Sequence, residues 1–391
     1  MTQNSSLIRS LTLRNILSYG LEGCDIALSP LNVFIGPNGS GKSNLIEAIV
    51  LLRSSANGLR ETVRAGGGVG EWIWKGNSRG VAVIDAVINN PNGNQPLRHI
   101  LAFRAEQQAF RLDDERIENE KSHLTDKDPY FYYRYQQGHP VLNVKNKERS
   151  LAQENVQPDV SILVQRRDPE SYPEISYLAS AYEKIRIYRE WAFGRNAIFR
   201  EPQKADMRND RLEEDFSNLG LFLNYLRQFP KAKNALLSAL RDLYDGLDDF
   251  DVSIKGGTVQ VFFTEGDFTI PATRLSDGTL RYLCLLAILC DPEPPPLVCI
   301  EEPELGLHPD ILPKLADLMI AMSERTQLIV TTHSDILVDA LTEQPESVLV
   351  CEKHDGKSTI QRLDPQKLTS WLEKYRLGEL WTRGELGGTR W

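Results

Sequence analysis

The chain has 391 residues, enough for two domains or for one large domain with an inserted lobe. Its hydrophobic share of 41% and charged share of 25% are typical of a soluble globular protein. The net charge of −9 argues against a nucleic-acid binder that is basic over its whole surface, although a local basic patch such as Arg186–Arg200 remains compatible with that role.

The N-terminal region predicts two strands and a helix around a glycine-rich loop. Alternating apolar and polar residues in Ile8–Leu13 predict a half-buried strand, and the apolar run Leu31–Ile35 predicts a second strand. GPNGSGKS follows at Gly36–Ser43, and apolar residues then recur at helical spacing from Leu45 to Leu52. We therefore expect a helix from about Lys42.

GPNGSGKS matches G-x-x-x-x-G-K-[ST], the phosphate-binding P-loop. Its glycines let backbone N–H groups point at phosphate oxygens, and the following helix adds its positive N-terminal end. In this role Lys42 reaches the β and γ phosphates, and the Ser43 hydroxyl ligates Mg²⁺. The flanking strand and helix favour a nucleotide site over a chance glycine loop. The predicted ATP-binding residues are Gly36, Pro37, Asn38, Gly39, Ser40, Gly41, Lys42, Ser43 and Asn44.

The middle of the chain predicts antiparallel strands followed by helices. Residues 81–88, 99–104 and 108–112 are typical of strands, with a turn at Asn89–Asn94. The aromatic stretch Tyr130–Tyr135 is compatible with base stacking, but alternating burial in a strand explains it too and is the favoured interpretation. Residues 161–165 could form a strand that ends at Gln165, and helices are expected over 173–193 and about 210–245.

The C-terminal third combines short strands with three polar motifs. Strands are expected at 252–254, 259–263 and 268–270; LSDGT at 275–279 then precedes an apolar helix over 280–289. The apolar run 297–300 predicts a buried parallel strand that ends at Glu301 and Glu302, at the edge where α/β sheets bind ligands. Another apolar strand, 328–330, leads to His333. Taken singly, these motifs are also explained by a capped helix, solvated glutamates and a structural histidine.

In this order, GPNGSGKS, LSDGT, LVCIEEPELGLHP and IVTTHS resemble the motifs of ABC-type ATPases, in particular the SMC, RecF and OLD (overcoming-lysogenization-defect) branch. LSDGT resembles the signature LSGGQ, EEPELGLHP the Walker B and D-loop, and TTHS the H-loop. Asn15–Tyr19 is similar to the opening of SMC and RecF heads. The resemblance covers roughly 1–90 and 270–340. It implies an α/β fold: an ABC-ATPase head, with a P-loop NTPase core sheet and an antiparallel β subdomain, plus an inserted helical lobe.

The resemblance also implies roles for single residues. Glu301 would hold Mg²⁺, Glu302 would orient or deprotonate the attacking water, and His333 would contact the γ-phosphate, so that Lys42, Glu302 and His333 form the catalytic set. Ser276 and Gly278 would bind the γ-phosphate held by a second protomer. Asp277 and Thr279 depart from LSGGQ, and Glu301 stands where the family usually has aspartate, which shifts the reach of its oxygens by a methylene.

Further candidates rest on weaker signals. Gln165 is the candidate glutamine for sensing Mg²⁺ and water, although a surface glutamine is the simpler interpretation, and Gln95, Gln107 and Gln108 compete with it. Arg60 and Arg64 are more simply explained as solvated charges. Five cysteines without C-x-x-C spacing favour a reducing, cytoplasmic location over a zinc site or disulfides. The longest apolar run, Leu283–Cys290, is far too short for a membrane span, and the first ten residues do not read as a signal peptide.

Four segments are expected. Residues 1–165 form the N-terminal part of the ATPase head, 166–250 the helical lobe, 251–345 the C-terminal part of the head, and 346–391 a tail that could dock a partner. The stretch after His333 is too short for the Toprim nuclease that OLD-type proteins carry. Any nuclease or toxin is therefore expected on a separate polypeptide, and the tryptophan-bearing segment Trp371–Trp391 is the expected docking site.

The predicted function is an ATP-hydrolysing switch that needs ATP and Mg²⁺. It would form a head-to-tail homodimer, or a higher oligomer, around ATP and control a separate effector in anti-phage defence. The main alternative is a RecF- or SMC-like ATPase of DNA repair or recombination, with nucleic acid as its partner. A transporter nucleotide-binding subunit and an inactive scaffold are less favoured, and no membrane partner is expected.

Overall fold

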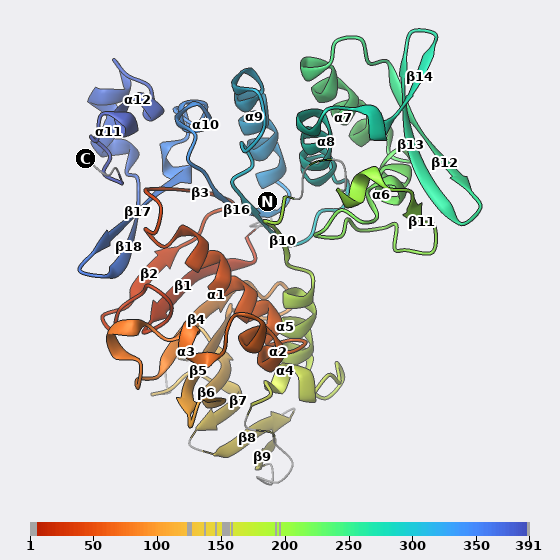
Figure 1. Ribbon diagram of the computed structural model, residues 1–391. Helices are drawn as coiled ribbons and strands as arrows, with labels where there is room; N and C mark the ends of the chain where they lie inside the picture. The colour runs from red at the N-terminus through yellow and green to blue at the C-terminus, as the bar shows by residue number, and fades with distance from the viewer. Residues whose placement is uncertain are drawn as a thin grey trace. The chain divides into compact units, whose positions relative to one another are not determined.

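The computed structural model describes residues 6–122, 127–136, 138–144, 147–150, 157, 159–191, 194 and 197–388. The chain forms two compact units, each with strands and helices of its own (Figure 1). The first unit comprises residues 1–185, 346–363 and 384–391. The second comprises residues 186–345 and 364–383. These boundaries differ from the four segments expected from the sequence, because each unit is assembled from stretches that lie far apart in the chain.

The first unit contains a large antiparallel sheet with the strand order β2-β1-β4-β5-β6-β7-β8-β9. Side chains alternate between the core and the outer face, as in β4, whose burial alternates at each residue. This confirms the antiparallel strands predicted between 81 and 112. The strands are β1 (Ile8–Arg14), β2 (Cys24–Ala27), β4 (Ala82–Ile88), β5 (Leu97–Glu106), β6 (Ala109–Asn119), β7 (Phe131–Gln136), β8 (His139–Val144) and β9 (Lys147–Ser150).

The strand that feeds the P-loop is β3 (Leu31–Ile35), and all five of its residues are buried. β17 (Val348–His354) pairs with β3 in parallel, and β18 (Lys357–Arg362) pairs with β17 in antiparallel. The interpretation of 346–391 as a tail is therefore wrong for residues 346–363. Val348–Cys351 are apolar and buried, so this segment is a strand next to the P-loop strand and not a surface extension.

Helices of the first unit follow the P-loop and pack near one another. They are α1 (Lys42–Ser54), α2 (Leu59–Ala65), α3 (Val69–Trp72), α4 (Ile162–Gln165) and α5 (Pro173–Glu183), with the 3₁₀ turn η1 (Lys75–Asn77). α1 contacts α5, and the Arg53 guanidinium donates to the carbonyl of Ile185 at 3.5 Å. The helix predicted over 173–193 is thus confirmed only to Glu183, because the chain then enters strand β10 (Arg186–Tyr188).

The predicted strand over 161–165 is wrong, because these residues form the short helix α4. Ser161 caps this helix: its hydroxyl accepts from the N–H of Leu163 at 3.1 Å. The buried Glu115 carboxylate accepts from the N–H of Ile162 at 3.0 Å. Both partners satisfy N–H groups that a helix leaves open at its first turn, so the side chains around 161 select helix over strand.

The second unit contains three parallel strands, β10 (Arg186–Tyr188), β15 (Leu297–Glu301) and β16 (Gln327–Thr331). β15 and β16 are buried almost throughout, as expected for strands covered on both faces. This confirms the two apolar strands predicted before Glu301 and His333. The helices that belong with them are α8 (Asp277–Leu289), α9 (Leu312–Ser323), α10 (Asp335–Asp339), α11 (Pro365–Leu372) and α12 (Leu377–Thr382), with the 3₁₀ turn η5 (Pro309–Ile311). The 3₁₀ turn η6 (Pro345–Ser347) begins with the last residue of the stretch 186–345 and continues into the first unit.

A smaller antiparallel sheet lies elsewhere in the second unit, with β13 at its centre (Figure 1). It buries Phe250, Val252, Val259 and Phe263, and two of its strands contact α6. The segment expected as a helical lobe is therefore divided: α5 belongs to the first unit, β10 belongs to the parallel strands, and the rest combines helices with this sheet. The strands of this smaller sheet are β11 (Gln203–Lys204), β12 (Asp249–Lys255), β13 (Thr258–Glu265) and β14 (Phe268–Pro271). The helical elements in this part of the chain are α6 (Leu219–Leu226), α7 (Pro230–Leu243), η3 (Ile198–Arg200) and η4 (Ala272–Arg274).

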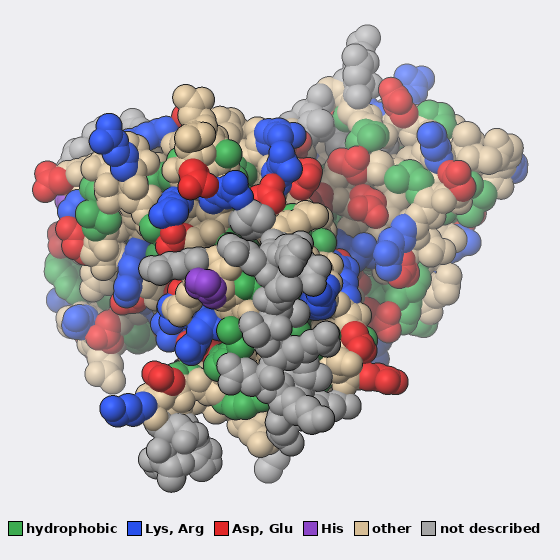
Figure 2. All heavy atoms as spheres, turned by 90° about the horizontal axis from the view of Figure 1, so that it is seen from below, with side chains coloured by type: hydrophobic (Ala, Val, Ile, Leu, Met, Phe, Trp, Pro, Cys, Tyr) green, Lys and Arg blue, Asp and Glu red, His purple; other side chains and the backbone are tan. Residues whose placement is uncertain are grey.

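Four further observations concern burial and surface. Tyr133 and Tyr135 of β7 are buried while their neighbours are only partly so, which confirms alternating burial in a strand. All five cysteines are buried, and none of them forms a disulfide. No helix among the described residues is long and apolar enough to cross a membrane. Figure 2 shows basic and acidic side chains interspersed over the face in view, without a continuous basic field.

Candidate functional site

The P-loop surrounds the ammonium group of its lysine, Lys42. Lys42 is the first residue of α1, and its side chain is buried. Its Nζ donates to the carbonyl of Gly36 at 2.7 Å and to that of Pro37 at 3.1 Å. The exposed Ser43 follows in the first turn of a helix of 13 residues. One cation, one hydroxyl and the positive end of a helix therefore meet at a single point, a combination suited to a polyphosphate.

Three glycines give the loop its shape. Gly36, Gly39 and Gly41 have φ angles of 144°, 78° and 108°, which L-residues with a side chain rarely adopt. A Cβ at Gly36 would lie 2.3 Å from the carbonyl oxygen of Cys351, and one at Gly41 would lie 2.4 Å from Oγ of Ser358. The loop is therefore packed tightly against β17 and β18 at Gly36 and Gly41, which leaves no room for larger residues at these two positions.

A group of hydroxyls behind the loop holds it in place. Ser18 Oγ accepts from Ser358 Oγ at 2.7 Å and from the amide of Asn44 at 2.8 Å. The buried Tyr19 hydroxyl donates to the carbonyl of Gly41 at 3.0 Å. Sequence reasoning noticed the segment that contains Ser18 and Tyr19 but missed Ser358. No local pattern marks Ser358, since it lies more than 300 residues after its partner.

Gln165 is used elsewhere and is not placed at the P-loop. Its amide donates to the carbonyl of Val160 at 2.8 Å. The neighbouring Arg167 donates to the carbonyl of Ala56, just beyond the C-terminal end of α1. Lys42 lies at the other end of α1, which at 1.5 Å per residue is roughly 20 Å away. The prediction that Gln165 senses Mg²⁺ is therefore not supported by its position.

The other candidate glutamines and Arg60 also take part in local turns or contacts. Gln107 and Gln108, with φ angles of 50° and 69°, form the turn between β5 and β6. Gln95 accepts from the N–H of Lys121 at 3.1 Å. Arg60, which is mostly exposed, pairs with Asp159 at 3.2 Å. These contacts agree with the simpler interpretation of each residue as a turn, a surface amide or a solvated charge.

In the second unit, the end of β15 presents a carboxylate to a histidine. Glu302 follows the last residue of β15 with a φ angle of 47°, and its N–H donates to the carbonyl of Thr331 at 2.9 Å. Its Oε1 lies 3.5 Å from Nε2 of His333, and both side chains are about one-third exposed. The structure thus brings two of the predicted catalytic residues together. Glu301 also ends β15, half-buried, on the same strand edge.

A third carboxylate, which sequence reasoning did not assign, supports this pair. Glu304 Oε1 accepts from the backbone N–H of His333 at 2.7 Å. Burial raises the pKa of the Glu304 carboxyl, and the hydrogen bond from His333 opposes that rise. Glu304 therefore fixes the backbone from which the His333 ring projects. Its place in the run EEPEL was visible in the sequence, but its partner was not.

The signature segment is a helix cap with an exposed serine. Ser276 Oγ accepts from the N–H of Thr279 at 3.1 Å at the start of α8, which agrees with the alternative interpretation of this motif as a capped helix. A Cβ on Gly278 would lie 3.2 Å from the carbonyl oxygen of Gly306 in the D-loop-like segment. Ser276 remains exposed, and the small residue at 278 lets the two segments lie close together.

Asp277, the departure from the usual signature, has a partner of its own. It pairs with Nη2 of Arg200 at 2.5 Å, and Arg200 also donates to the carbonyl of Thr273 at 2.7 Å. The hydrogen bond from Arg200 lowers the pKa of the Asp277 carboxyl. Arg200 is engaged here and Arg186 is buried, so these two residues do not form the exposed basic patch suggested by the sequence of 186–200.

Comparison with known families shows to which family this chain belongs. The pattern of the family described as "AAA domain, putative AbiEii toxin, Type IV TA system" matches residues 31–339. The chain belongs to this AAA family. The match begins at the P-loop strand and extends past His333, so it includes the P-loop, the signature segment and the carboxylates in one pattern.

Solved structures similar to this AAA-family chain include SMC heads. One is the Smc head bound to the C-winged helix domain of ScpA: 16% identical, TM-score 0.57, covering 93% of this chain and 99% of that chain. Another is the Smc head with an extended coiled coil bound to the C-terminal domain of ScpA from Pyrococcus furiosus: 14% identical, TM-score 0.56, covering 94% and 99%. At these identities they show the fold alone, and they confirm the predicted α/β ABC-ATPase head.

Curated relatives match over a short stretch. The "DNA replication and repair protein RecF" of Vibrio vulnificus strain YJ016, like that of strain CMCP6, is 64% identical over 33 residues. This stretch is 8% of the chain and spans only 9% of these relatives' length. This short stretch, the family pattern and the SMC-head fold agree with the resemblance to the SMC and RecF branch that the motifs indicate.

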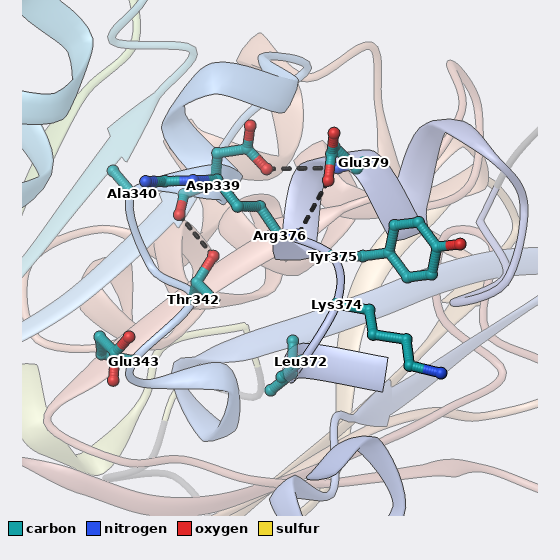
Figure 3. A pocket seen from close by; sticks show the side chains of 9 residues that line it. All are labelled: Asp339, Ala340, Thr342, Glu343, Leu372, Lys374, Tyr375, Arg376 and Glu379. Atoms are coloured by element: carbon teal, nitrogen blue, oxygen red, sulfur yellow. Dashed lines mark hydrogen bonds between the residues drawn. The ribbon is translucent and has the colours of Figure 1, made fainter. Parts of the chain in front are cut away.

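The C-terminal helices of the AAA-family chain line a pocket of about 460 Å³ (Figure 3). Asp339 Oδ1 accepts from the N–H of Gly378 at 2.6 Å and of Glu379 at 3.2 Å, and Glu379 accepts from the N–H of Arg376 at 3.0 Å. Two of the pocket's three carboxylates thus cap α12, which anchors residues 364–383 to α10. Trp391, part of the predicted docking segment, lies outside the described residues.

Proposed function

We propose that this chain is an ATP-hydrolysing switch in which the P-loop residues Gly36–Ser43 and the carboxylates of Glu301 and Glu302 act on the same nucleotide. The observation that carries the proposal is the Glu302–His333 pair at 3.5 Å, formed where two neighbouring buried strands, β15 and β16, end, as a base and a phosphate ligand would be. It is supported by the single family pattern that spans both motif sets. Glu302 would orient or deprotonate the attacking water, while His333 and Lys42 would bind the γ-phosphate.

The donors available to Mg²⁺ suit this ion. Ser43 offers an exposed hydroxyl and Glu301 a half-buried carboxylate, the hard oxygen ligands that Mg²⁺ prefers. Among the described residues, no cluster of three or more His, Cys, Asp or Glu could form a dedicated metal cage. That fits a cation held by one or two side chains plus substrate phosphates. When bound, Mg²⁺ would neutralise charge on the β and γ phosphates.

The proposed switch depends on a second copy of the chain. Ser276 and Gly278 would contact the γ-phosphate held by the partner, and Ser276 is exposed at the N-terminus of α8, which has 13 residues. ATP would then be bound by two chains and ADP by one, so the free energy of γ-phosphate binding would favour the dimer and hydrolysis would release it.

Glu302→Gln tests the switch. It removes the base but keeps the size of the side chain, so ATP should still bind while turnover falls by about 10²-fold or more. Size-exclusion chromatography with ATP and Mg²⁺ should show a dimer that persists, whereas wild type returns to monomer as ATP is consumed. Glu324→Gln, an exposed change after α9, is the matched control. A Glu302→Gln variant that stays monomeric with ATP and turns over normally would show the proposal to be wrong.

We also propose that the switch controls a separate effector, a nuclease or toxin, in anti-phage defence. The family description names a toxin and a Type IV TA system, which supports a companion protein. α11 has no buried residue and exposes Trp371, as a docking helix would. Trp371→Ala should abolish co-purification of the companion encoded beside this chain. Undiminished co-purification would exclude α11 as the docking site.

The second candidate function is a DNA repair or recombination ATPase, favoured by the 33-residue match to RecF. It predicts that duplex DNA stimulates ATP turnover and that binding weakens steeply as salt rises, because phosphate contacts release counterions. Turnover measured with and without DNA at two salt concentrations separates it from the effector-controlling switch.

A further inference from the structure

Arg281 is a buried arginine on the signature helix. Its side chain is 1% exposed and is among the largest fully buried side chains of the described residues. It lies on α8, five positions after Ser276. Burial lowers the pKa of the Arg281 guanidinium to about 10, so the group stays charged at neutral pH. A charge kept in a protein interior requires strong local partners, so its contacts indicate its role.

One contact joins the signature helix to the proposed base. Arg281 Nη2 donates to the backbone carbonyl of Glu302 at 2.7 Å. Glu302 has a φ angle of 47°, a conformation that is unfavourable for a non-glycine residue and persists only where neighbours hold it. Arg281 is one such neighbour; others are Thr331, whose carbonyl accepts from the Glu302 N–H, and Leu305, whose N–H donates to the Glu302 carbonyl at 3.3 Å.

The second contact brings in Trp191. The Arg281 guanidinium carbon lies 4.4 Å from the centroid of the Trp191 ring, and Trp191 Nε1 donates to the backbone carbonyl of Glu301 at 2.8 Å. Trp191 is itself stacked on the buried Phe216, with centroids 5.4 Å apart and planes at 24°. Arg281 and Trp191 thus bind the carbonyls of two consecutive residues, Glu302 and Glu301, and support each other through a cation–π contact.

We infer that Arg281 and Trp191 are positioning residues that clamp the main chain of the two acidic residues and thereby couple the signature helix to the base Glu302. This inference rests on the proposed ATPase function. A shift of α8 when Ser276 binds a partner's phosphate would reach the Glu302 carbonyl directly through Arg281. The reach of the Glu302 carboxylate toward water would then depend on occupancy of the signature segment.

The chain contains a matched control for this clamp. Arg325 donates to the carbonyls of Asp291 at 2.6 Å and Leu289 at 3.3 Å, so it holds the opposite end of α8. Arg325→Met and Arg281→Met each remove one guanidinium from backbone carbonyls at an end of the same helix. A merely structural role predicts similar effects on activity, whereas a positioning role confines the loss of turnover to Arg281→Met.

The expected kinetic result is a loss of kcat without a loss of binding. Since a misplacement of about 1 Å can cost about 10²-fold, Arg281→Met should lower kcat by roughly 30-fold or more and change the Kd for a non-hydrolysable ATP analogue less than about 3-fold. Arg325→Met should keep kcat within about 3-fold. Trp191→Phe, which keeps the ring but loses the Nε1 donor, and Arg281→Lys, which keeps the charge but loses the planar group, should fall between these two.

Hydrogen exchange on the full chain makes the test independent of turnover. In Arg281→Met, a peptide spanning 298–308 should exchange roughly 10-fold faster, while peptides from α8 should not change. Arg325→Met should show the reverse. Equal exchange of 298–308 in both variants, or unchanged kcat in Arg281→Met, would overturn the clamp. If wild type shows no ATP turnover but the exchange pattern holds, the proposed function fails and the clamp stands.

Discussion

Replacing Gly36 with alanine tests whether the P-loop is shaped by its packing on β17. Gly36 and Gly39 both have positive φ angles, 144° and 78°, so either substitution introduces backbone strain of about 1 to 3 kcal/mol. The two positions differ in the room available for a Cβ. A Cβ at Gly36 would lie 2.3 Å from the backbone oxygen of Cys351, whereas one at Gly39 has nothing within 4 Å. Gly39→Ala is therefore a matched control for strain.

The clash should add a measurable difference in stability. A Cβ rarely comes closer than about 3.4 Å to other atoms, so β17 or the loop must move by about 1 Å, and overpacking of this kind costs about 1 to 3 kcal/mol. Since 1 kcal/mol shifts Tm by about 2 to 4 °C in a unit of roughly 200 residues, Gly36→Ala should melt about 2 to 12 °C below Gly39→Ala.

The assay is thermal denaturation of the full chain without nucleotide, followed by circular dichroism, so that phosphate binding cannot contribute to the difference. Denaturant titration of both variants would show whether the difference comes from stability or from a changed slope. Equal melting temperatures, within about 1 °C, would refute the argument, because they would mean that the Cys351 carbonyl does not constrain the loop.

Two further predictions concern the second unit. Burial raises the pKa of Asp291 from its usual 3.8 to about 6, so the stability that the neutral carboxyl provides is lost as pH rises between these values. At pH 7.5, Asp291→Asn should therefore raise the melting temperature and increase the free energy of unfolding by up to about 3 kcal/mol. At pH 3.5, the same change should leave both nearly unchanged. Trp371, 41% exposed, and Trp381, 8% exposed, should differ on truncation: urea denaturation should show a loss below about 0.5 kcal/mol for Trp371→Ala and about 3 to 5 kcal/mol for Trp381→Ala. A pH-independent effect at Asp291, or equal losses at the two tryptophans, would contradict these burial arguments.

The sequence predicted the features that depend on neighbours within a few residues. The glycine pattern of GPNGSGKS marks the loop because positive φ angles at Gly36, Gly39 and Gly41 are a local requirement. The alternation in Ile8–Leu13 and the apolar run before Glu301 mark strands because side-chain direction repeats along the backbone. The resemblance of four ordered motifs was enough to predict the ABC-ATPase head before any tertiary contact was known.

Local patterns misled where a side chain from elsewhere decided the outcome. Residues 161–165 look like a strand by composition, but Glu115 supplies a helix-capping carboxylate from β6. The segment 346–363 looks like a tail because it follows the last motif, yet Val348–Val350 pair with β3. Neither outcome is encoded in the spacing of nearby residues, since each depends on a partner more than 40 positions away.

What the sequence alone determined is therefore which chemical groups stand at which ends of strands and helices: a loop with the P-loop pattern, consecutive carboxylates and a histidine. Tertiary structure alone decided how these groups are held. Ser358 reaches Ser18 behind the loop, Glu304 fixes the backbone of His333, and Arg281 with Trp191 binds the carbonyls of the two acidic residues. The reason is physical: periodicity reports which face a residue occupies, whereas a supporting contact depends on which distant segment folds against that face.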